Sequence, residues 1–371
     1  MTEVETVHVD LGARGYDIHV GVGVLGMADQ YLSPVLRRRR VVTVTDETVA
    51  ELQLPALDRA LENGEIEHHA VVLPPGEASK SFARLEWLIE RLLDARIERS
   101  TTLLALGGGM IGDLAGFAAS VVLRGIDYLQ LPTTLLAQVD SSVGGKTGIN
   151  TRHGKNLVGS FHQPRLVLAD IGALDTLGRR EFLAGYAEVV KYGLIGDAKF
   201  FAWLEAHGAD LIDGDPDLRR HAVVTACGTK AGVVAADERE AGPRALLNFG
   251  HTFGHALEAE TGFGDELLHG EAVAIGMVTA FALSARLGLC PAADAARVRR
   301  HLAAVGLPTD LAHLSGRVWD AGRLFEHMAQ DKKVRDGKLR FVLSRGIGQA
   351  FVCDAVAPDQ LIGVLEEAIA A

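Results

Sequence analysis

The stretch Thr102-Leu103-Leu104-Ala105-Leu106-Gly107-Gly108-Gly109-Met110-Ile111-Gly112-Asp113 decides the fold of the first part of the chain. Its apolar run is typical of a buried strand, and the glycines that follow it open a helical pattern. This context suits a nucleotide pyrophosphate, which binds backbone N–H groups at a helix N-terminus. The match to Gly-x-Gly-x-x-Gly is weak when taken alone, and a tight strand-to-helix turn is the alternative explanation of the glycines. The stretch also comes after several strands, so we expect any dinucleotide to bind in a non-standard arrangement.

Similar strands surround this stretch. Three further apolar runs predict buried parallel strands: Val41–Thr45, Ala70–Leu73 and Tyr128–Leu131. Leu166–Ala169, after a long glycine-rich loop, predicts another strand. Helical patterns such as Ser81–Asp94 separate them, and Val4–Val9 with Tyr16–Val20 predicts a hairpin. The alternation of strands and helices predicts a doubly wound α/β domain.

The pattern changes after residue 178. Long helical patterns follow: Arg180–Ile195, Leu218–Ala236, Ala245–Thr261 and Glu271–Leu287. We therefore predict two domains, an α/β domain over residues 1–178 and an all-α domain over residues 179–371.

Composition limits the classes of function. The net charge of −11 disfavours nucleic acid as a partner. Three distant cysteines, Cys227, Cys290 and Cys353, fit neither a disulfide framework nor a Cys-x-x-Cys metal site, which favours a reducing, cytoplasmic setting. The acidic N-terminus does not resemble a signal peptide. Ala272–Ala285 falls short of the roughly 20 residues that span a bilayer, so no membrane partner is expected.

Glycine is concentrated in one polar region. Residues 107–159 hold 11 glycines, about twice the share of 42 in 371 for the whole chain. Gly144–Thr147 resembles the end of a P-loop, but Asp140 occupies the position of the first glycine, which excludes that NTPase motif. Asp140, Lys146, Lys155 and Asn156 remain in a glycine-rich loop. These groups predict binding of a phosphorylated, hydroxylated small molecule.

A polar stripe marks the second half. Arg244, Asn248, His251 and His255 fall at i, i+4, i+7 and i+11, which places them on one face of a predicted helix. A lone His-x3-His pair is more often structural than metal-binding. His269 and a separate helix with Glu188 and Lys191 add an imidazole, a carboxylate and an ammonium. Two imidazoles and one carboxylate suit Zn²⁺ with an open coordination position.

Some residues remain ambiguous on the sequence alone. Asp46 is either a helix N-cap or a ribose ligand. Lys230 is either a solvated surface lysine or a ligand-binding group, and Asp331-Lys332-Lys333 is equally ambiguous.

Several segments together resemble the dehydroquinate synthase family of sugar phosphate cyclases. They cover most of the chain in the family's order: Gly107–Asp113, Pro132–Thr147, Gly154–Gly159, Ala187–Gly193, Ala236–Glu240, Leu247–His255 and Leu268–Glu271. Two small departures are Pro75, where the family often has an acid, and Pro243, which suits the first turn of a helix.

The resemblance implies an NAD-binding N-terminal domain and a helical metal-binding C-terminal domain. The implied ligands of Zn²⁺, with Co²⁺ also possible, are Glu188, His251 and His269. The implied NAD contacts are Asp46, Glu77, Lys80, Gly108, Gly109, Gly112, Asp113, Thr133, Thr134, Lys146, Lys155 and Thr176. The implied substrate contacts are Asp140, Lys146, Asn156, Lys191, Lys230, Arg244, Asn248, His255 and one of Lys332 and Lys333. Arg124 resembles an arginine that reaches the neighbouring subunit's site, which implies a homodimer.

The implied reaction belongs to the shikimate pathway of aromatic amino acid biosynthesis. It converts 3-deoxy-D-arabino-heptulosonate 7-phosphate to 3-dehydroquinate and phosphate, with NAD⁺ regenerated in each turnover. The alternatives are a sister cyclase that acts on sedoheptulose 7-phosphate or an amino analogue, and a metal-dependent polyol dehydrogenase. Lys230 and Arg244 suit a substrate carboxylate, which sedoheptulose 7-phosphate lacks. A non-catalytic metal-binding protein would leave the glycine-rich region unexplained.

Overall fold

The chain forms two compact units. The computed structural model describes residues 3–240, 242–314, 316–330 and 340–370. The first unit comprises Met1–Gly178 and Pro216–Arg239, and the second comprises Arg179–Asp215 and Glu240–Ala371. The predicted division at residue 178 is one of these boundaries. The prediction assigned α8 (Pro216–Ala236) to the second domain. In the structure α8 belongs to the first unit, where it packs against β1 and β2.

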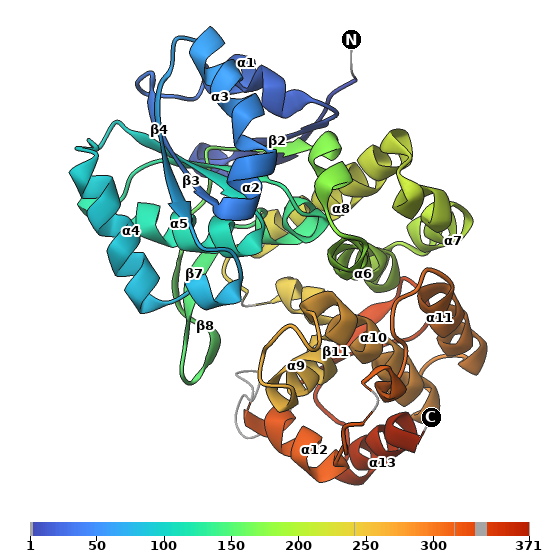
Figure 1. Cartoon of the computed structure of the whole chain (residues 1–371). Helices are drawn as coiled ribbons and strands as arrows, with labels where there is room; N and C mark the ends of the chain where they lie inside the picture. The colour runs from blue at the N-terminus through green and yellow to red at the C-terminus, as the bar shows by residue number, and fades with distance from the viewer. Residues whose placement is uncertain (1–2, 241, 315, 331–339, 371) are drawn as a thin grey trace. The chain divides into compact units, whose positions relative to one another are not determined.

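A seven-stranded sheet organises the first unit (Figure 1). The strand order is β1-β2-β9-β6-β5-β3-β4, and every neighbouring pair except β1 with β2 is parallel. The strands are β1 (Glu5–Val9), β2 (Tyr16–Gly21), β3 (Arg40–Asp46), β4 (Glu67–Leu73), β5 (Thr102–Gly107), β6 (Tyr128–Pro132) and β9 (Leu166–Asp170). The predicted hairpin and the four predicted parallel strands are confirmed. The further predicted strand over Leu166–Ala169 is β9, which is also parallel to its neighbours.

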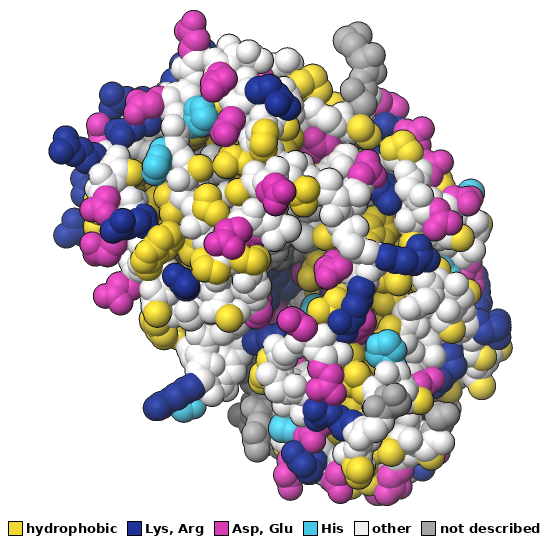
Figure 2. Space-filling view, viewed as in Figure 1, with side chains coloured by type: hydrophobic (Ala, Val, Ile, Leu, Met, Phe, Trp, Pro, Cys, Tyr) yellow, Lys and Arg dark blue, Asp and Glu magenta, His cyan; other side chains and the backbone are white. Residues whose placement is uncertain are grey.

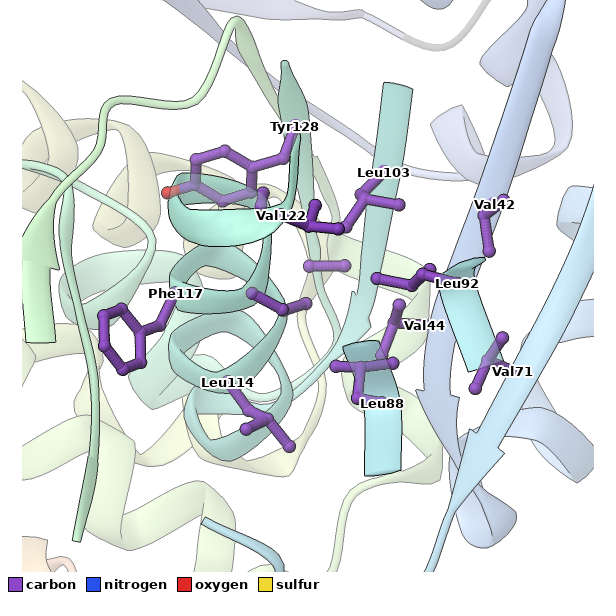
Figure 3. Close-up of a cluster of buried hydrophobic side chains, with 14 of the residues drawn as sticks. Val42, Val44, Val71, Leu88, Leu92, Leu103, Leu114, Phe117, Val122 and Tyr128 are labelled. Carbon is purple, nitrogen blue, oxygen red and sulfur yellow. The ribbon is translucent and has the colours of Figure 1, made fainter. Parts of the chain in front are cut away.

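Helices cover both faces of this sheet because its buried strands alternate their side chains between two cores. Leu103 faces the core formed with α4 (Phe82–Asp94) and α5 (Gly109–Val121), where Leu88, Leu92 and Leu114 pack (Figure 3). The next residue, Leu104, faces the opposite core. Helices α1 (Ala28–Leu32) and α3 (Leu54–Asn63) contribute buried residues to that core, and Val49 of α2 (Glu47–Leu52) packs against it. Two covered faces are the doubly wound arrangement.

One part of the glycine-rich region is a hairpin rather than the predicted loop. Strands β7 (Lys146–Thr151) and β8 (Gly154–Phe161) pair antiparallel, with Gly148 opposite Gly159. A Cβ atom on Gly159 would lie 2.0 Å from the carbonyl oxygen of Thr147. The two backbones approach so closely that only glycine fits, and glycine weakens the sequence signal for a strand.

The second unit is mostly helical. Its helices are α6 (Arg179–Gly196), α7 (Ala198–Asp213), α9 (His251–Glu260), α10 (His269–Arg286), α11 (Ala292–Ala304), α12 (Ala321–Gln330) and α13 (Pro358–Ala370). It also contains a two-stranded antiparallel sheet, β10 (Phe341–Ser344) with β11 (Ala350–Cys353). The predicted all-α character is therefore correct for the main architecture and wrong for this small sheet.

Charges of both signs are mixed over the surface. On the face shown in Figure 2, Lys and Arg side chains lie among Asp and Glu side chains. Among the helices that the structure describes, none has both the length and the apolar character needed to cross a bilayer.

Close packing around α5 leaves little room for a side chain at Gly116. A Cβ atom there would lie 2.5 Å from Thr147 Cγ2 and 3.1 Å from Tyr128 Cε2. We expect Gly116→Ala to destabilise the protein by about 1–3 kcal/mol through overpacking. The measurement is the urea midpoint together with the Tm.

Gly228 in α8 provides the matched control. It is exposed, and a Cβ atom there would meet nothing within 4 Å. Gly228→Ala should therefore stabilise the helix by about 0.5–1 kcal/mol, because alanine loses less conformational entropy than glycine. A Gly116→Ala protein as stable as wild type would contradict the packing argument.

Candidate active site

The turn from β5 to α5 lies at the carboxyl end of the sheet and is made of glycines. Gly108 is the N-cap residue of α5, and Thr133 N–H donates to Gly107 O at 3.0 Å. Cβ atoms on Gly108 and Gly109 would lie 3.1 Å from Thr134 Cγ2 and 3.0 Å from Ser141 Oγ, respectively. Side chains at these two positions would be crowded against Thr134 and Ser141. The first N–H groups of a helix bind anions. The turn therefore fits a dinucleotide pyrophosphate.

Gly112 has a different structural role. A Cβ atom on Gly112 would lie 2.6 Å from Gln130 Oε1, on strand β6 under the helix. The glycine thus allows α5 to pack against the sheet. The last glycine of a dinucleotide-binding fingerprint has this role in other folds.

Lys80 contacts two residues for which the family resemblance implies different ligands. Its ammonium group is buried and lies 2.5 Å from both Asp113 Oδ2 and Asn156 Oδ1. Burial raises the pKa of Asp113 above its ordinary value, although Lys80 opposes this effect. The structure therefore connects two implied NAD contacts with an implied substrate contact inside the first unit.

Asp140 and Lys230 form a second polar pair in this unit. Lys230 Nζ donates to Asp140 Oδ1 at 2.8 Å and to Asp140 O at 2.6 Å. Lys230 is 5% exposed, so the solvated-surface interpretation of this lysine is wrong. Asp140 lies in the single turn of π-helix Ala137–Ser141, a feature that is frequent at functional sites.

The other implied contacts of the first unit lie near the ends of its strands and in its loops. Asp46 Oδ1 accepts the N–H of Val49 at 3.0 Å, so Asp46 caps α2. Thr176 Oγ1 accepts from Gln53 at 2.9 Å. Arg124, at the end of a 3₁₀ turn after α5, has a left-handed backbone and is exposed. Its role and those of Lys146 and Lys155 stay predictions.

In the second unit, three helices bring a candidate metal-binding group together. The carboxylate of Glu188 on α6 lies 3.5 Å from His251 Nε2 and 3.7 Å from His269 Nε2. The ligand atoms of these three residues all lie within 4.8 Å of one another. Glu188 is fully buried, and neither of its oxygens accepts a well-aligned hydrogen bond from the described residues, although Lys191 Nζ forms an ion pair with Oε2. Such a carboxylate, faced by two imidazoles, fits a divalent cation.

Hydrogen bonds orient both imidazoles toward this point. His251 Nδ1 lies 3.2 Å from Phe249 O, and His269 Nδ1 lies 3.1 Å from the buried carboxylate of Glu258. Both contacts favour the proton on Nδ1 and leave Nε2 available as a ligand atom. Burial lowers the pKa of His269, but Glu258 and Glu188 outweigh burial and raise it to about 10. This environment favours positive charge at Nε2, either as a proton or as a metal ion that replaces the proton.

His255, Glu258 and His269 form a second, overlapping group of possible ligands. Glu258 Oε2 in that group is already engaged by His269 Nδ1. The group around Glu188 fits a metal ion better, because its carboxylate lies against two Nε2 atoms without hydrogen-bond geometry.

Glycines allow the three helices to approach. A Cβ atom on Gly270, next to His269, would lie 2.0 Å from Ala184 O on α6. A Cβ atom on Gly276 of α10 would lie 2.1 Å from Gly250 O, directly before α9. These contacts set the helix spacing that brings the three candidate ligands within reach of one ion.

The predicted continuous helix over Ala245–Thr261 is wrong. Pro243–Asn248 forms a 3₁₀ turn, Gly250 adopts a left-handed φ of 80°, and α9 begins at His251. Arg244 and Asn248 therefore do not share a helix face with His251 and His255. Arg244 is 2% exposed, and Asn248 Nδ2 donates to Glu240 Oε1 at 2.8 Å.

Sequence reasoning missed three polar residues at these sites. Asn150 and Glu240 contact predicted site residues, and Glu258 orients His269. Glu258 could have been found from its i+3 spacing to His255 on one helix. Lys332 and Lys333, the alternative substrate lysines, lie outside the described residues.

Comparison with solved structures defines the class as sugar phosphate cyclase-like. The fold is similar to that of 2-epi-5-epi-valiolone synthase from Streptomyces hygroscopicus subsp. jinggangensis 5008, solved with NAD⁺ and Zn²⁺ bound. The TM-score is 0.86 and the identity 31%, over 95% of this chain and 96% of that one. A 2-deoxy-scyllo-inosose synthase complexed with carbaglucose-6-phosphate, NAD⁺ and Co²⁺ has a TM-score of 0.85 and 26% identity, over 98% and 100%. Likeness to an iron-containing alcohol dehydrogenase, at 15% identity and a TM-score of 0.68, concerns the fold alone.

Sequence relatives narrow this class. Residues 70–184 match the 3-dehydroquinate synthase N-terminal family, and residues 185–334 match its C-terminal family. The 3-dehydroquinate synthase of Rhodospirillum rubrum is 64% identical over 98% of this chain and 94% of its own. That of Ruegeria pomeroyi is 57% identical over 99% of both chains. The chain belongs to the 3-dehydroquinate synthase family.

The contact of Glu258 with His269 generates a prediction about metal affinity. Glu258→Gln keeps the size of the side chain but removes the charge that orients and polarises the imidazole. We expect affinity for Zn²⁺, measured by competition with a chromogenic chelator, to fall about 10- to 100-fold. Removal of a direct ligand by His251→Ala should weaken binding further.

Glu260→Gln is the control on the same helix. Glu260 is mostly buried and pairs with His327 and Arg323, away from the three candidate ligands. Its substitution should leave Zn²⁺ affinity within about twofold of wild type, since loss of metal affinity needs a contact with a ligand. Equal losses in both variants would contradict a specific role of Glu258.

Proposed function

We propose that this chain converts 3-deoxy-D-arabino-heptulosonate 7-phosphate into 3-dehydroquinate and phosphate. The observation that carries the proposal is the 56–64% identity to 3-dehydroquinate synthases over nearly the whole chain. The cyclases named for other products have only 26–31% identity. The sister cyclase and the polyol dehydrogenase are therefore not favoured.

NAD⁺ and a divalent metal ion, Zn²⁺ or Co²⁺, are the proposed cofactors. When bound, NAD⁺ supplies reversible hydride transfer and the metal ion lowers the pKa of substrate hydroxyls. Support comes from the glycine turn at Gly108–Gly109, at the N-terminus of α5, and from the group of Glu188, His251 and His269. Two structural neighbours were solved with the same kinds of cofactor.

The chain's own polar residues bind and orient the substrate in this proposal. Arg244 binds the carboxylate through its planar guanidinium, which presents two parallel donors. The Asp140–Lys230 pair contacts substrate hydroxyl and carboxylate oxygens together, because its two groups lie 2.8 Å apart. The remaining proposed contacts are Lys146, Asn156, Asn248 and His255 for the phosphate end, Lys191 for the hydroxyls, and Lys332 or Lys333.

We also propose a homodimer in a reducing, cytoplasmic setting. The exposed, left-handed Arg124 supports the dimer, because it is accessible to a second subunit. Cys227, Cys290 and Cys353 are free thiols, as expected in a reducing compartment.

The first functional prediction concerns the balance of NAD⁺. Because the hydride returns to the substrate, each turnover should release one phosphate while no NADH accumulates at 340 nm. A trace of NAD⁺ should suffice for many turnovers. Stoichiometric NADH formation, or faster turnover of sedoheptulose 7-phosphate, would overturn the proposal.

The second functional prediction concerns Arg244. A charge-assisted hydrogen bond is worth about 1.5–3 kcal/mol. Arg244→Ala should therefore lower kcat/KM for the heptulosonate phosphate roughly 10- to 150-fold. Arg244→Lys should restore activity only in part, since a point charge cannot make two parallel bonds.

Arg286→Ala is the control for loss of a positive charge in the same unit. Arg286 pairs with Glu367 and has no proposed contact with substrate. Its kcat/KM should match that of wild type. Unchanged kcat/KM in Arg244→Ala would exclude the carboxylate role.

A further inference from the structure

Asn150 lies at an irregularity of the β7–β8 hairpin. Ile149 pairs with Val158 and Thr151 pairs with Gly154, so a single residue of β7 lies opposite three residues of β8. The three residues are the bulge Lys155–Leu157, which carries two proposed ligand contacts. Bulges of this kind redirect side chains and are enriched beside active sites.

The side-chain amide of Asn150 holds two segments at once. Its Nδ2 donates to Glu77 Oε1 at 2.7 Å, and its Oδ1 accepts the N–H of Asn156 at 3.0 Å. Its backbone N–H donates to Lys80 O at 2.8 Å. Asn150 therefore contacts the segment of Glu77 and Lys80 as well as the bulge of β8.

The bond to Asn156 stabilises an unusual backbone. Asn156 has a φ of +56°, a left-handed conformation that side chains other than glycine adopt at a cost. In this conformation its Oδ1 lies 2.5 Å from Lys80 Nζ. A hydrogen bond that fixes the N–H of Asn156 therefore also fixes the amide that Lys80 contacts.

We propose that Asn150 is a positioning residue that couples the NAD-binding segment to the substrate-binding bulge. Its donor atom orients Glu77 on the NAD side, and its acceptor atom orients Asn156 on the substrate side. The inference rests on the proposed function, because Glu77 and Asn156 are proposed ligand contacts. It assigns Asn150 no contact of its own with either ligand.

Two substitutions separate the two hydrogen bonds. Asn150→Ala removes both, so the Kd for NAD⁺ and the KM for the heptulosonate phosphate should each rise about tenfold, as expected for lost bonds to oriented polar groups. Asn150→Asp keeps the acceptor for Asn156 but places a second carboxylate against Glu77. It should weaken NAD⁺ binding as much as Asn150→Ala while the KM stays within about twofold of wild type.

Calorimetric titration measures the Kd for NAD⁺ without turnover, and steady-state phosphate release measures the KM for the heptulosonate phosphate. Thr151→Ala is the matched control, because Thr151 makes its hydrogen bonds within the β7–β8 turn, to His153 and Gly154. It should leave both constants unchanged, even if the Tm falls. If Asn150 had only a structural role, both substitutions would lower the Tm, and Asn150→Asp would not raise the Kd for NAD⁺ selectively over the KM.

Double-mutant cycles provide a second, independent readout. The effects of Asn150→Ala and Asn156→Ala on KM should be less than additive, since both disrupt one contact. Additive effects, or an Asn150→Asp variant with unchanged Kd for NAD⁺, would overturn the inference. If the wild-type protein binds NAD⁺ but does not turn over the heptulosonate phosphate, the proposed function is wrong. The Kd for NAD⁺ of the Asn150 variants still tests the positioning of Glu77.

Discussion

The second unit is built around a carboxylate that has no access to solvent. An isolated buried carboxylate costs several kcal/mol or more, so its charge must be compensated. Lys191, one turn along α6, supplies one positive charge to Glu188, and two imidazoles approach it through Nε2. These imidazoles come from two other helices, so three helices meet at Glu188. Gly270 and Gly276 make this possible by removing the side chains that would hold the helices apart.

Glycine meets two opposite demands in this protein. Gly108 and Gly109 lie at the start of α5, where backbone N–H groups can bind an anion. Gly112 and Gly116 of the same helix instead let buried side chains of β6 and β7 approach it. A fingerprint of spaced glycines therefore combines a binding function with a packing function. The sequence pattern does not separate the two, because both need the same missing Cβ atom.

The main architecture was predictable where local and tertiary forces agree. The strand Thr102–Leu106 is apolar on both faces because helices cover both, so its composition identified it. The hairpin of β7 and β8 was not predicted because it contains Gly148 and Gly159. These glycines allow the two backbones to approach closely, but glycine has a low strand propensity. The predicted helix over 245–261 was too long. Its polar residues have helical spacing, but Gly250 adopts a left-handed conformation that interrupts the helix.

The candidate site was predictable in its residue types and less so in its pairings. The polar stripe of Arg244, Asn248, His251 and His255 was noticed through a helical periodicity that the structure does not contain. Lys230 could be matched with Asp140 only in three dimensions, since 90 residues separate them. Asn150 gave no signal because its hydrogen bonds depend on a bulge, and a bulge depends on the register of two strands.

The Asp140–Lys230 pair changes how the carboxylate of the proposed substrate would be recognised. The sequence suggested that Lys230 and Arg244 both offer positive charge to that carboxylate. In the structure, Asp140 already neutralises Lys230, so the pair carries no net charge and offers donors and acceptors in a fixed arrangement. An incoming anion gains little Coulomb energy from a neutral pair compared with a lone ammonium group. In the proposed function, selection for a carboxylate therefore depends more on Arg244 than on Lys230, while the pair fixes the orientation of the neighbouring oxygens.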